Sequence, residues 1–191
     1  DVNTNQFMQK TINDYMKTIT DSTYIEAITD IKTELSALNK KLPKNLKELA
    51  LNLSKDTISL NYVLQKKKIK VIDFWASWCS PCIKEIIKSK EQRDKIIDKF
   101  NIEFIYLSLD SNTEKWIDKS IDLSHYLTSV HQYKVLKPKK SNFIKKLNIR
   151  ASYGLSIPRY VILDENNRII DNNAPKPSNS EFEEIITKLS Y

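Results

Sequence analysis

The sequence is poor in glycine and cysteine and contains no long hydrophobic run. One glycine occurs in 191 residues, so most tight turns must be made by asparagine, aspartate, serine or proline. Only two cysteines are present, which excludes a framework of structural disulfides. No stretch has the length and apolarity of a transmembrane helix. We therefore expect membrane association only through a segment outside this chain.

The net charge of +7 comes from lysines that are spread along the chain and often alternate with acids. A diffuse basic charge permits attraction to acidic partners or membrane surfaces, but it establishes neither. Residues 134–146 are rich in lysine and are interleaved with Tyr133 and Phe143, a pattern that also occurs on nucleic-acid-binding surfaces. No recognisable nucleic-acid-binding module accompanies it, so we predict no nucleic-acid partner.

Residues 69–87 combine a buried strand with the start of a helix. The apolar run 69–75 is rich in β-branched and aromatic residues and predicts a strand, whereas isoleucines at 83, 86 and 87 mark one face of a helix. The motif Cys-Ser-Pro-Cys at 79–82 lies between them, with its proline suited to a first helical turn. Unpaired N–H groups and the helix dipole favour an anion there, and a cysteine pKa falls from about 8.5 to about 3.5–7.5 in such settings.

We expect the Cys79 sulfur to be exposed at the helix start and Cys82, one turn further in, to be more buried. This arrangement predicts an attacking thiolate and a resolving thiol that exchange with a disulfide. One alternative is a pair of buried apolar cysteines without a redox role. Another is a zinc site completed by His125 and His131. The long gap and the spacing of the histidines argue against zinc, and we predict neither a metal nor an organic cofactor.

The pattern D-F-W-A-x-W-C-x-P-C over residues 73–82 resembles the active-site motif of the thioredoxin superfamily. Glu85, in the pattern C-x-x-C-x-x-E, is more similar to the TlpA/ResA-like branch of extracytoplasmic thiol–disulfide oxidoreductases. An Ile-Pro pair at 157–158 strengthens the likeness. The resemblance covers about residues 56–190. It implies an α/β thioredoxin-like fold, with a central mixed sheet flanked by helices.

The resemblance also implies the activity, which is thiol–disulfide exchange by a cysteine pair that cycles between dithiol and disulfide. Members of the TlpA/ResA-like branch are mostly reductants fed by a membrane electron donor. We therefore expect reduction of disulfide-bearing extracytoplasmic proteins, with electrons from a membrane-embedded or soluble thiol donor. Ser80 replaces the glycine of many thioredoxins, which leaves oxidation or isomerisation open as the alternative. The same resemblance implies a periplasmic location, or a membrane anchor that faces the periplasm.

Two acids accompany the cysteines as candidate catalytic residues. Asp73 lies six residues before Cys79 in a largely apolar strand, where burial raises the pKa of a carboxyl group. It matches an aspartate of thioredoxin and could accept the Cys82 proton. Alternatively, it is an ordinary strand-end residue with a hydrogen-bonded partner. Glu85 matches an acid that tunes the cysteine pair in the ResA-like branch, or else it is a solvated helix residue paired with a neighbouring lysine.

The resemblance further implies the substrate-binding residues, which are Trp78, Pro81, Ile157, Pro158 and Arg159. Pro158 resembles the cis-proline that faces the cysteine pair, and it would leave the Ile157 backbone free to pair with an extended substrate. Arg159 departs from the threonine often found at this position. Its cation near the sulfurs would lower a cysteine pKa or select acidic substrates.

Residues 1–55 have no strand pattern and predict an all-helical N-terminal extension. Apolar residues fall on two helical stripes, over 7–19 and 25–42, and a short third helix is expected over 46–53. The stripes span fewer than three heptads. We therefore expect them to pack within a helical domain or on the neighbouring domain, with a coiled-coil seam as the alternative.

Residues 56–191 are predicted to form the thioredoxin-like domain, with a helical insertion around 112–147. A helix over 81–100 carries Arg93 on its solvent face, and Ser178 and Ser180 are candidate caps of the last helix because each has a glutamate three residues on. The remaining predicted elements are strands at 102–109 and 157–164, a hairpin return at 168–171, and helices beginning near 113 and 142.

Overall fold

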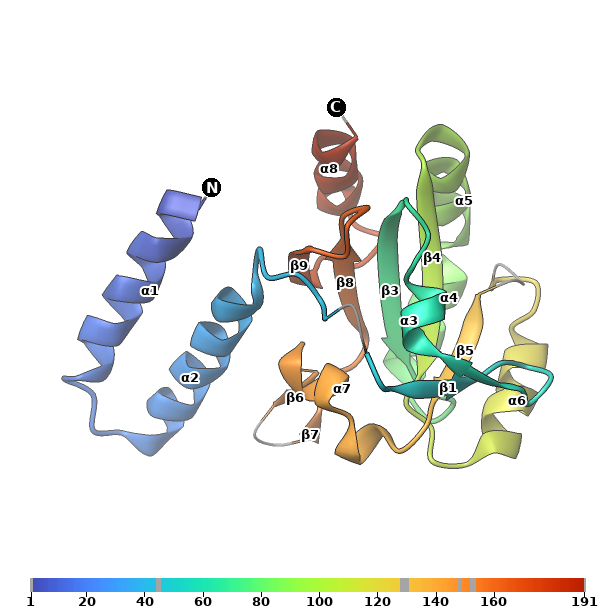
Figure 1. Ribbon diagram of the computed structural model, residues 1–191, viewed down its shortest axis with the longest axis horizontal. Coiled ribbons are helices and arrows are strands. Elements are labelled where there is room, and N and C mark those ends of the chain that lie inside the picture. Colours follow the sequence, from blue (N-terminus) through green and yellow to red (C-terminus); the bar gives the residue numbers. More distant parts are fainter. Residues whose placement is uncertain (1, 44–45, 128–130, 148, 152–153, 191) are drawn as a thin grey trace.

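The computed structural model describes residues 2–43, 46–127, 131–147, 149–151 and 154–190. A seven-stranded sheet in the order β2-β1-β5-β4-β3-β8-β9 forms its centre (Figure 1). Strands β3, β4 and β5 are parallel, and the other pairs are antiparallel. This confirms the mixed sheet. The strands are β1 (Leu49–Leu51), β2 (Thr57–Ser59), β3 (Ile69–Trp75), β4 (Ile102–Ser108), β5 (Gln132–Val135), β8 (Arg159–Leu163) and β9 (Ile169–Ala174), with a separate pair β6 (Arg150–Ala151) and β7 (Gly154–Leu155).

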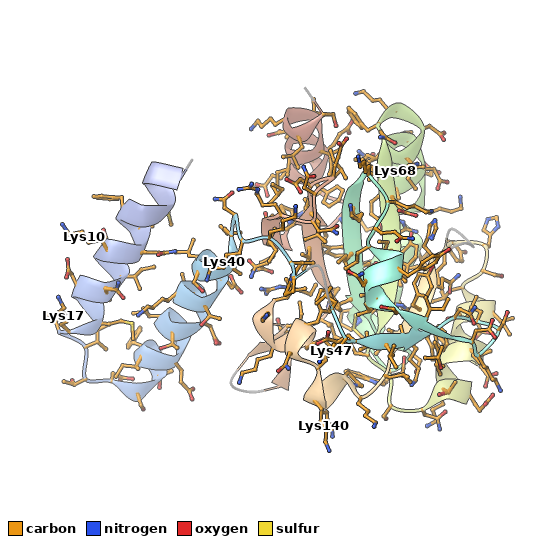
Figure 2. All side chains as sticks on the ribbon, in the orientation of Figure 1. Lys10, Lys17, Lys40, Lys47, Lys68 and Lys140 are labelled. Atoms are coloured by element: carbon orange, nitrogen blue, oxygen red, sulfur yellow. A yellow bond between two sulfur atoms is a disulfide. The ribbon has the colours of Figure 1, made fainter. Side chains whose placement is uncertain are left out.

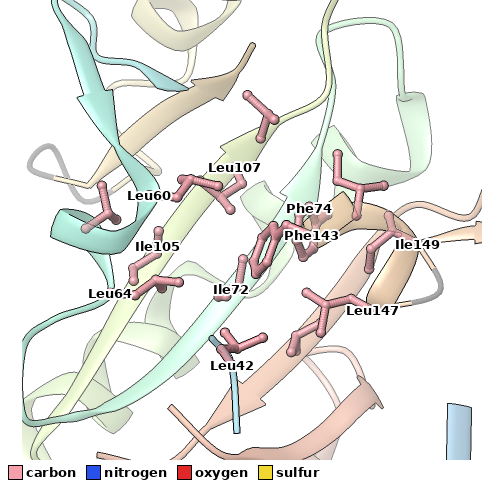
Figure 3. Packing of buried hydrophobic residues seen from close by; sticks show 14 of the residues in the cluster. Leu42, Leu60, Leu64, Ile72, Phe74, Ile105, Leu107, Phe143, Leu147 and Ile149 are labelled. Atoms are coloured by element: carbon pink, nitrogen blue, oxygen red, sulfur yellow. The ribbon is translucent and has the colours of Figure 1, made fainter. Parts of the chain in front are cut away.

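Helices cover both faces of the sheet (Figure 1). One face carries α3 (Leu60–Val63) and α7 (Asn142–Lys146), and the other carries α4 (Ser80–Lys88), α5 (Lys90–Lys99), α6 (Thr113–Asp122) and α8 (Ser180–Leu189). Side chains along β3 alternate between the faces, because successive residues of a strand point to opposite sides. Phe74 packs 6.1 Å from Phe143 of α7 between ring centroids (Figure 3). Trp75 enters the opposite core, which also holds both cysteines.

The two central strands end together. Every residue of β4 is buried, as expected for a parallel strand covered on both faces. Its register with β3 runs from Ile69↔Ile102 to Trp75↔Ser108. The loop after β3, which carries the cysteine motif, therefore leaves the sheet beside the loop after β4.

The N-terminal helices α1 (Val2–Met16) and α2 (Ser22–Ala37) pack on each other, and α2 lies between α1 and β9 (Figure 1). Asp21 caps α2 by accepting a hydrogen bond from the Thr23 N–H at 2.8 Å, so the second helix begins between the two predicted apolar stripes. Glu34 of α2 forms an ion pair with Arg159 at 2.8 Å, and this pair ties the helical hairpin to the sheet. The division of the chain into an N-terminal extension, residues 1–55, and a second domain, residues 56–191, remains our proposal.

Three predicted helical segments differ in the structure. The third N-terminal helix is wrong, because Leu49–Leu51 is strand β1 and pairs with both β5 and β2. The segment 112–147 contains β5 as well as helices. Sheet pairing outweighs a weak helical preference in segments this short. The helix predicted over 81–100 is divided at Ser89, whose hydroxyl donates to the Glu85 carbonyl at 2.6 Å.

A buried charge cluster lies at the end of β4 opposite to the cysteines. Glu103 is 6% exposed, and its Oε1 contacts Lys66 Nζ and His131 Nε2, each at 2.7 Å. Burial alone would raise the pKa of this carboxyl group. The hydrogen bonds and charges of His131 and Lys66 prevail and lower the pKa from 4.5 to about 2.

We expect Glu103→Gln to lower the free energy of unfolding by about 2 kcal/mol at pH 7. Because the folded pKa lies below the ordinary one, this stabilisation is present above pH 4.5 and disappears as the pH falls towards 2. Urea unfolding from pH 7 to pH 3 should show the gap between variant and wild type narrowing. The control Glu114→Gln removes an exposed pair with Lys55 and should cost less than about 0.5 kcal/mol. A gap independent of pH would contradict this account.

Candidate active site

A disulfide joins Cys79 and Cys82 at the beginning of α4, with an S–S distance of 1.99 Å and a Cα–Cα distance of 5.3 Å. Cys79 is the N-cap of this helix, and its sulfur accepts a hydrogen bond from the Cys82 N–H at 3.2 Å. Pro81 occupies the first turn, where a missing N–H leaves no helical bond unmade. The predicted delivery of a cysteine pair from a buried strand to a helix start is confirmed.

The disulfide is almost completely enclosed. Cys79 is 4% exposed and Cys82 is fully buried, whereas the adjacent Trp78 is 61% exposed. The expectation that the Cys79 sulfur is openly exposed is therefore wrong for this disulfide form, because the side chain packs into the apolar cluster with Trp75. The expected order holds, since Cys79 is the more accessible of the two. Trp78 forms exposed surface next to the disulfide.

Asp110 holds the cysteine loop against the end of β4. Its Oδ2 accepts hydrogen bonds from the Ser77 N–H and the Ser108 hydroxyl, both at 2.8 Å, and its Oδ1 accepts one from the Ser77 hydroxyl at 2.7 Å. Sequence analysis missed this role. The available signal was an acid two residues after a buried strand. The cap of α6 is Asn112.

Asp73 lies on β3, on the same face as the cysteine core. It is fully buried, and neither carboxyl oxygen has a well-formed hydrogen bond among the described residues. Burial raises the pKa of Asp73 from 3.8 to about 7; the Arg93 charge and the Tyr160 hydroxyl oppose the rise, and the Glu85 charge reinforces it. A carboxyl group with this pKa exchanges a proton near neutrality, which suits it to acid–base chemistry.

Glu85 lies on the buried side of α4 and is 5% exposed. Its two carboxyl oxygens accept hydrogen bonds from the Ser178 N–H at 2.9 Å and from the Ser178 hydroxyl at 3.0 Å. The solvated alternative for Glu85 is therefore wrong. The predicted caps Ser178 and Ser180 are both wrong, since the N-cap of α8 is Asn179 and Ser180 is its first helical residue.

Arg93 and Tyr160 complete the buried polar group, and sequence analysis missed both. Arg93 was predicted on the solvent face but is 1% exposed, because the break at Ser89 turns α5 relative to α4. Its guanidinium donates to the Ile86 carbonyl at 2.9 Å and to the Ser89 hydroxyl at 2.5 Å. Tyr160 is opposite Asp73 in the β3–β8 register, and burial raises the pKa of its phenol well above 10.

The peptide bond between Ile157 and Pro158 is cis, as the resemblance implied. It directly precedes β8, whose Phe74↔Arg159 pairing places it beside the end of β3, from which the cysteine loop leaves. Ile157 also packs against the core that contains Cys79. The bond and the cysteine loop therefore share one edge of the sheet.

Arg159 is placed differently from the expectation at the sulfurs. Its side chain shares a face with Phe74, in the core opposite to the cysteines, and is 4% exposed. The guanidinium donates to the Asn172 carbonyl at 2.6 Å and to Glu34 at 2.8 Å. Its contacts thus connect β8 with β9 and α2.

The zinc alternative receives no geometric support. The cysteines form a disulfide, and His131 contacts Glu103 at the far end of β4. Within the described ranges, no group of three or more His, Cys, Asp or Glu residues is arranged to hold a metal ion. In the same part of the chain, none of the helices has the length and apolarity to span a bilayer.

We expect Glu85→Gln to lower the pKa of Asp73, because it removes a neighbouring negative charge that raises that pKa. The measurement is an NMR titration of the Asp73 carboxyl carbon, in which the midpoint should move below the wild-type value of about 7. Glu91→Gln on the exposed side of α5 is the matched control and should leave the midpoint unchanged. An unchanged midpoint in Glu85→Gln would show that the two carboxyl groups are uncoupled.

Comparison with known proteins gives one family and several similar structures. A family model described as Redoxin matches residues 30–187. A Bacteroides vulgatus protein of known structure, assigned as a thiol-disulfide oxidoreductase, is 27% identical, with a TM-score of 0.57 over 74% of this chain and 90% of that chain. The thioredoxin domain of a thiol-disulfide oxidoreductase from the same organism shares the fold, with 18% identity and a TM-score of 0.58 over 80% of this chain and 100% of that one.

A curated relative is similar over a shorter segment. Thioredoxin from Buchnera aphidicola subsp. Baizongia pistaciae (strain Bp) is 40% identical over 53 residues, which are 25% of this chain and 49% of that protein. The chain thus spans about half the length of this relative.

Proposed function

This chain belongs to the Redoxin family of the thioredoxin superfamily, and we propose that it reduces disulfide bonds of extracytoplasmic proteins through Cys79 and Cys82. The domain with this cysteine pair is that of a thiol–disulfide oxidoreductase. The observation that carries the proposal is the Cys79–Cys82 disulfide at the start of α4. Backbone N–H groups there stabilise a thiolate, which is the attacking form of cysteine.

In the first step, the Cys79 thiolate attacks one sulfur of a substrate disulfide. The substrate S–S bond breaks, a mixed disulfide forms with Cys79, and the leaving thiolate takes a proton from solvent. The small exposure of Cys79, which is 4%, against the complete burial of Cys82 supports this division of roles. Trp78 and Pro81 would contact the arriving substrate, and the Ile157 backbone, next to the cis bond at Pro158, would pair with its extended chain.

In the second step, Cys82 gives its proton to Asp73 and attacks the Cys79 sulfur. The mixed disulfide breaks, the Cys79–Cys82 bond forms, and the second substrate thiolate leaves. The substrate has then gained two electrons and the enzyme has lost them. The pKa of about 7 supports Asp73 as the proton acceptor, and the charge of Glu85 helps to keep that pKa high. Arg159, held by Glu34, would act on substrate binding only through the position of β8.

We further propose that a membrane-embedded or soluble thiol donor returns the two electrons, and that the protein works outside the cytoplasm. The C-x-x-C-x-x-E pattern supports both proposals through its likeness to the TlpA/ResA-like branch. Residues 1–55 would form the N-terminal extension of a catalytic domain at 56–191, and its strand β1 joins the sheet of that domain. Protein disulfides are the substrate class that the family implies.

A redox titration tests the direction of the reaction. The purified protein is equilibrated with dithiothreitol and glutathione buffers, and the fraction of the Cys79–Cys82 disulfide is measured by mass spectrometry after alkylation. A potential near about −270 mV, as in thioredoxin, would support a reductase. A value near about −120 mV, as in DsbA, would overturn the proposed direction in favour of an oxidase.

A further inference from the structure

A groove of about 620 Å³ opens beside Trp78, on the side of β4 and β5. Its walls are Trp78 itself, residues 109–111 after β4, Lys134 of β5 and residues 136–140 after β5. Parallel β-strands present their carboxyl ends at one edge of the sheet, which is where ligands commonly bind in α/β folds. The groove therefore begins at the cysteine loop and extends away from the cis-proline side of the sheet.

Lysines dominate the charge of this groove. Lys134, Lys137, Lys139 and Lys140 line it, against the single acid Asp110. The Asp110 carboxylate is already engaged by the hydroxyl and N–H groups described above. The groove is consequently a site of positive potential, and Lys140 marks its position in Figure 2.

Lys134 is the most informative of these residues, because it is 4% exposed and yet lines the groove. Among the described residues, its ammonium forms no hydrogen bond or ion pair, and Asp110 acts on it only through its charge. Burial lowers the pKa of this lysine, and the Asp110 charge opposes the change. The Lys134 ammonium is not among the fully buried, unpaired polar atoms of the described residues, so it opens to the groove, where an anion can pair with it.

We propose that this groove binds an acidic segment of the substrate protein, next to the disulfide that Cys79 attacks. The inference rests on the proposed function and adds the class of substrate. A carboxylate of the bound segment pairs with the Lys134 ammonium, and Lys137 and Lys140 contact acids nearer the rim. Leu109, Leu136 and Pro138 supply apolar contacts for the intervening residues.

The size and composition of the groove favour a peptide over a small free anion. A volume of about 620 Å³ falls in the range that encloses a ligand of several residues, which is larger than a single inorganic ion. Its lining contains both apolar and cationic groups, as expected for a site that binds a chain with both kinds of side chain. Because the groove begins at Trp78, next to the disulfide, the acidic segment bound there lies close in sequence to the substrate cysteine.

The test compares two peptides that differ only in charge. Each carries one cysteine as a mixed disulfide with thionitrobenzoate, flanked either by glutamates or by glutamines. Pre-reduced protein is mixed with each peptide, and release of the chromophore gives a second-order rate constant. We expect the acidic peptide to react about tenfold faster at low salt, with the preference shrinking at 0.5 M NaCl.

Groove variants should reduce this preference. Lys137→Asn/Lys140→Gln should slow the acidic peptide about fivefold and the neutral peptide less than twofold. Asparagine is chosen because Lys137 has φ 52°, a conformation that asparagine tolerates. Lys134→Met should abolish most of the remaining preference, and the exposed double variant keeps the test decisive if Lys134→Met fails to fold.

The matched control removes two positive charges elsewhere. Lys10→Gln/Lys67→Gln changes α1 and the loop before β3, and Lys68 of that loop lies at the opposite end of the domain from Lys140 (Figure 2). This control should keep the full preference. Equal rates for the two peptides would overturn the proposal that the groove binds an acidic segment, and so would equal losses of the rate preference in groove and control variants. Either result would leave the proposed disulfide reduction intact.

A binding experiment separates the groove from the chemistry. A fluorescent glutamate-rich peptide without cysteine is titrated with the oxidised protein and followed by anisotropy, with the glutamine version as reference. The proposed peptide site is supported if the acidic peptide binds the wild type and binds Lys137→Asn/Lys140→Gln more weakly. This result would hold even if neither disulfide peptide is reduced and the proposed function fails. Absence of acidic-peptide binding overturns it. Complete displacement by 10 mM inorganic phosphate would instead indicate a small-anion site and would also overturn the peptide assignment.

Discussion

Replacement of Cys79 by serine is expected to lower the rate of protein disulfide reduction by more than about a thousandfold, because a serine hydroxyl cannot attack a disulfide as the thiolate does. Insulin reduction with dithiothreitol as the electron source provides the assay. Folding of the variant is checked by circular dichroism, since the native disulfide is absent. A Cys79→Ser protein that retained wild-type activity would remove Cys79 from the mechanism.

Cys82→Ser is the informative partner of this variant. It keeps the attacking thiol at the start of α4 but has no group to resolve the mixed disulfide. We expect one substrate molecule to remain covalently attached through Cys79, so mass spectrometry should detect a stoichiometric adduct and no turnover. Cys79→Ser should form no adduct, because Cys82 is completely buried. Adducts of the opposite pattern would exchange the roles of the two cysteines.

The second large effect is expected from Asp73→Asn, which should stabilise the oxidised protein at pH 8 by about 3 kcal/mol. The folded pKa of about 7 lies above the ordinary value of 3.8, so the folded state holds the proton more tightly than the unfolded chain. Wild-type stability should therefore fall as the pH rises from 4 to 7 and stay low above 7. Asparagine does not titrate, and the two proteins should have similar stabilities near pH 4.

Guanidinium unfolding at pH 4, 6 and 8 measures this difference, with Asp118→Asn on the exposed side of α6 as the control. The control should follow the wild type at each pH. In the same variants, resolution of the mixed disulfide should lose its pH dependence near 7 only in Asp73→Asn, because the proton acceptor for Cys82 is gone. Equal stability of Asp73→Asn and wild type at pH 8 would mean that ionisation of the buried carboxyl group does not destabilise the folded protein.

Local patterns in the sequence were sufficient for the elements that carry the cysteine pair. The apolar run 69–75 predicted β3, the Cys-Ser-Pro-Cys motif predicted the beginning of α4, and the segment before 113 predicted the start of α6. Each of these signals lies within a few residues of the feature it specifies. The resemblance added the cis bond before Pro158, which the local sequence pattern does not predict.

The surroundings of the disulfide depended on residues that are far apart in the chain. Glu85 meets Ser178 across 93 residues, and Glu34 meets Arg159 across 125. Arg93 is buried because α4 and α5 separate at Ser89, a break that the helical periodicity did not reveal.

The sequence by itself thus determined that two cysteines stand at the junction of a buried strand and a helix, because that information is local. Only the tertiary structure decided which charges lie behind and beside them. The order of the strands brings β5 and the Lys134 ammonium to the groove, and the packing of α8 brings Ser178 to Glu85. Contacts of this kind arise from which faces of distant elements meet, and no short segment contains that information.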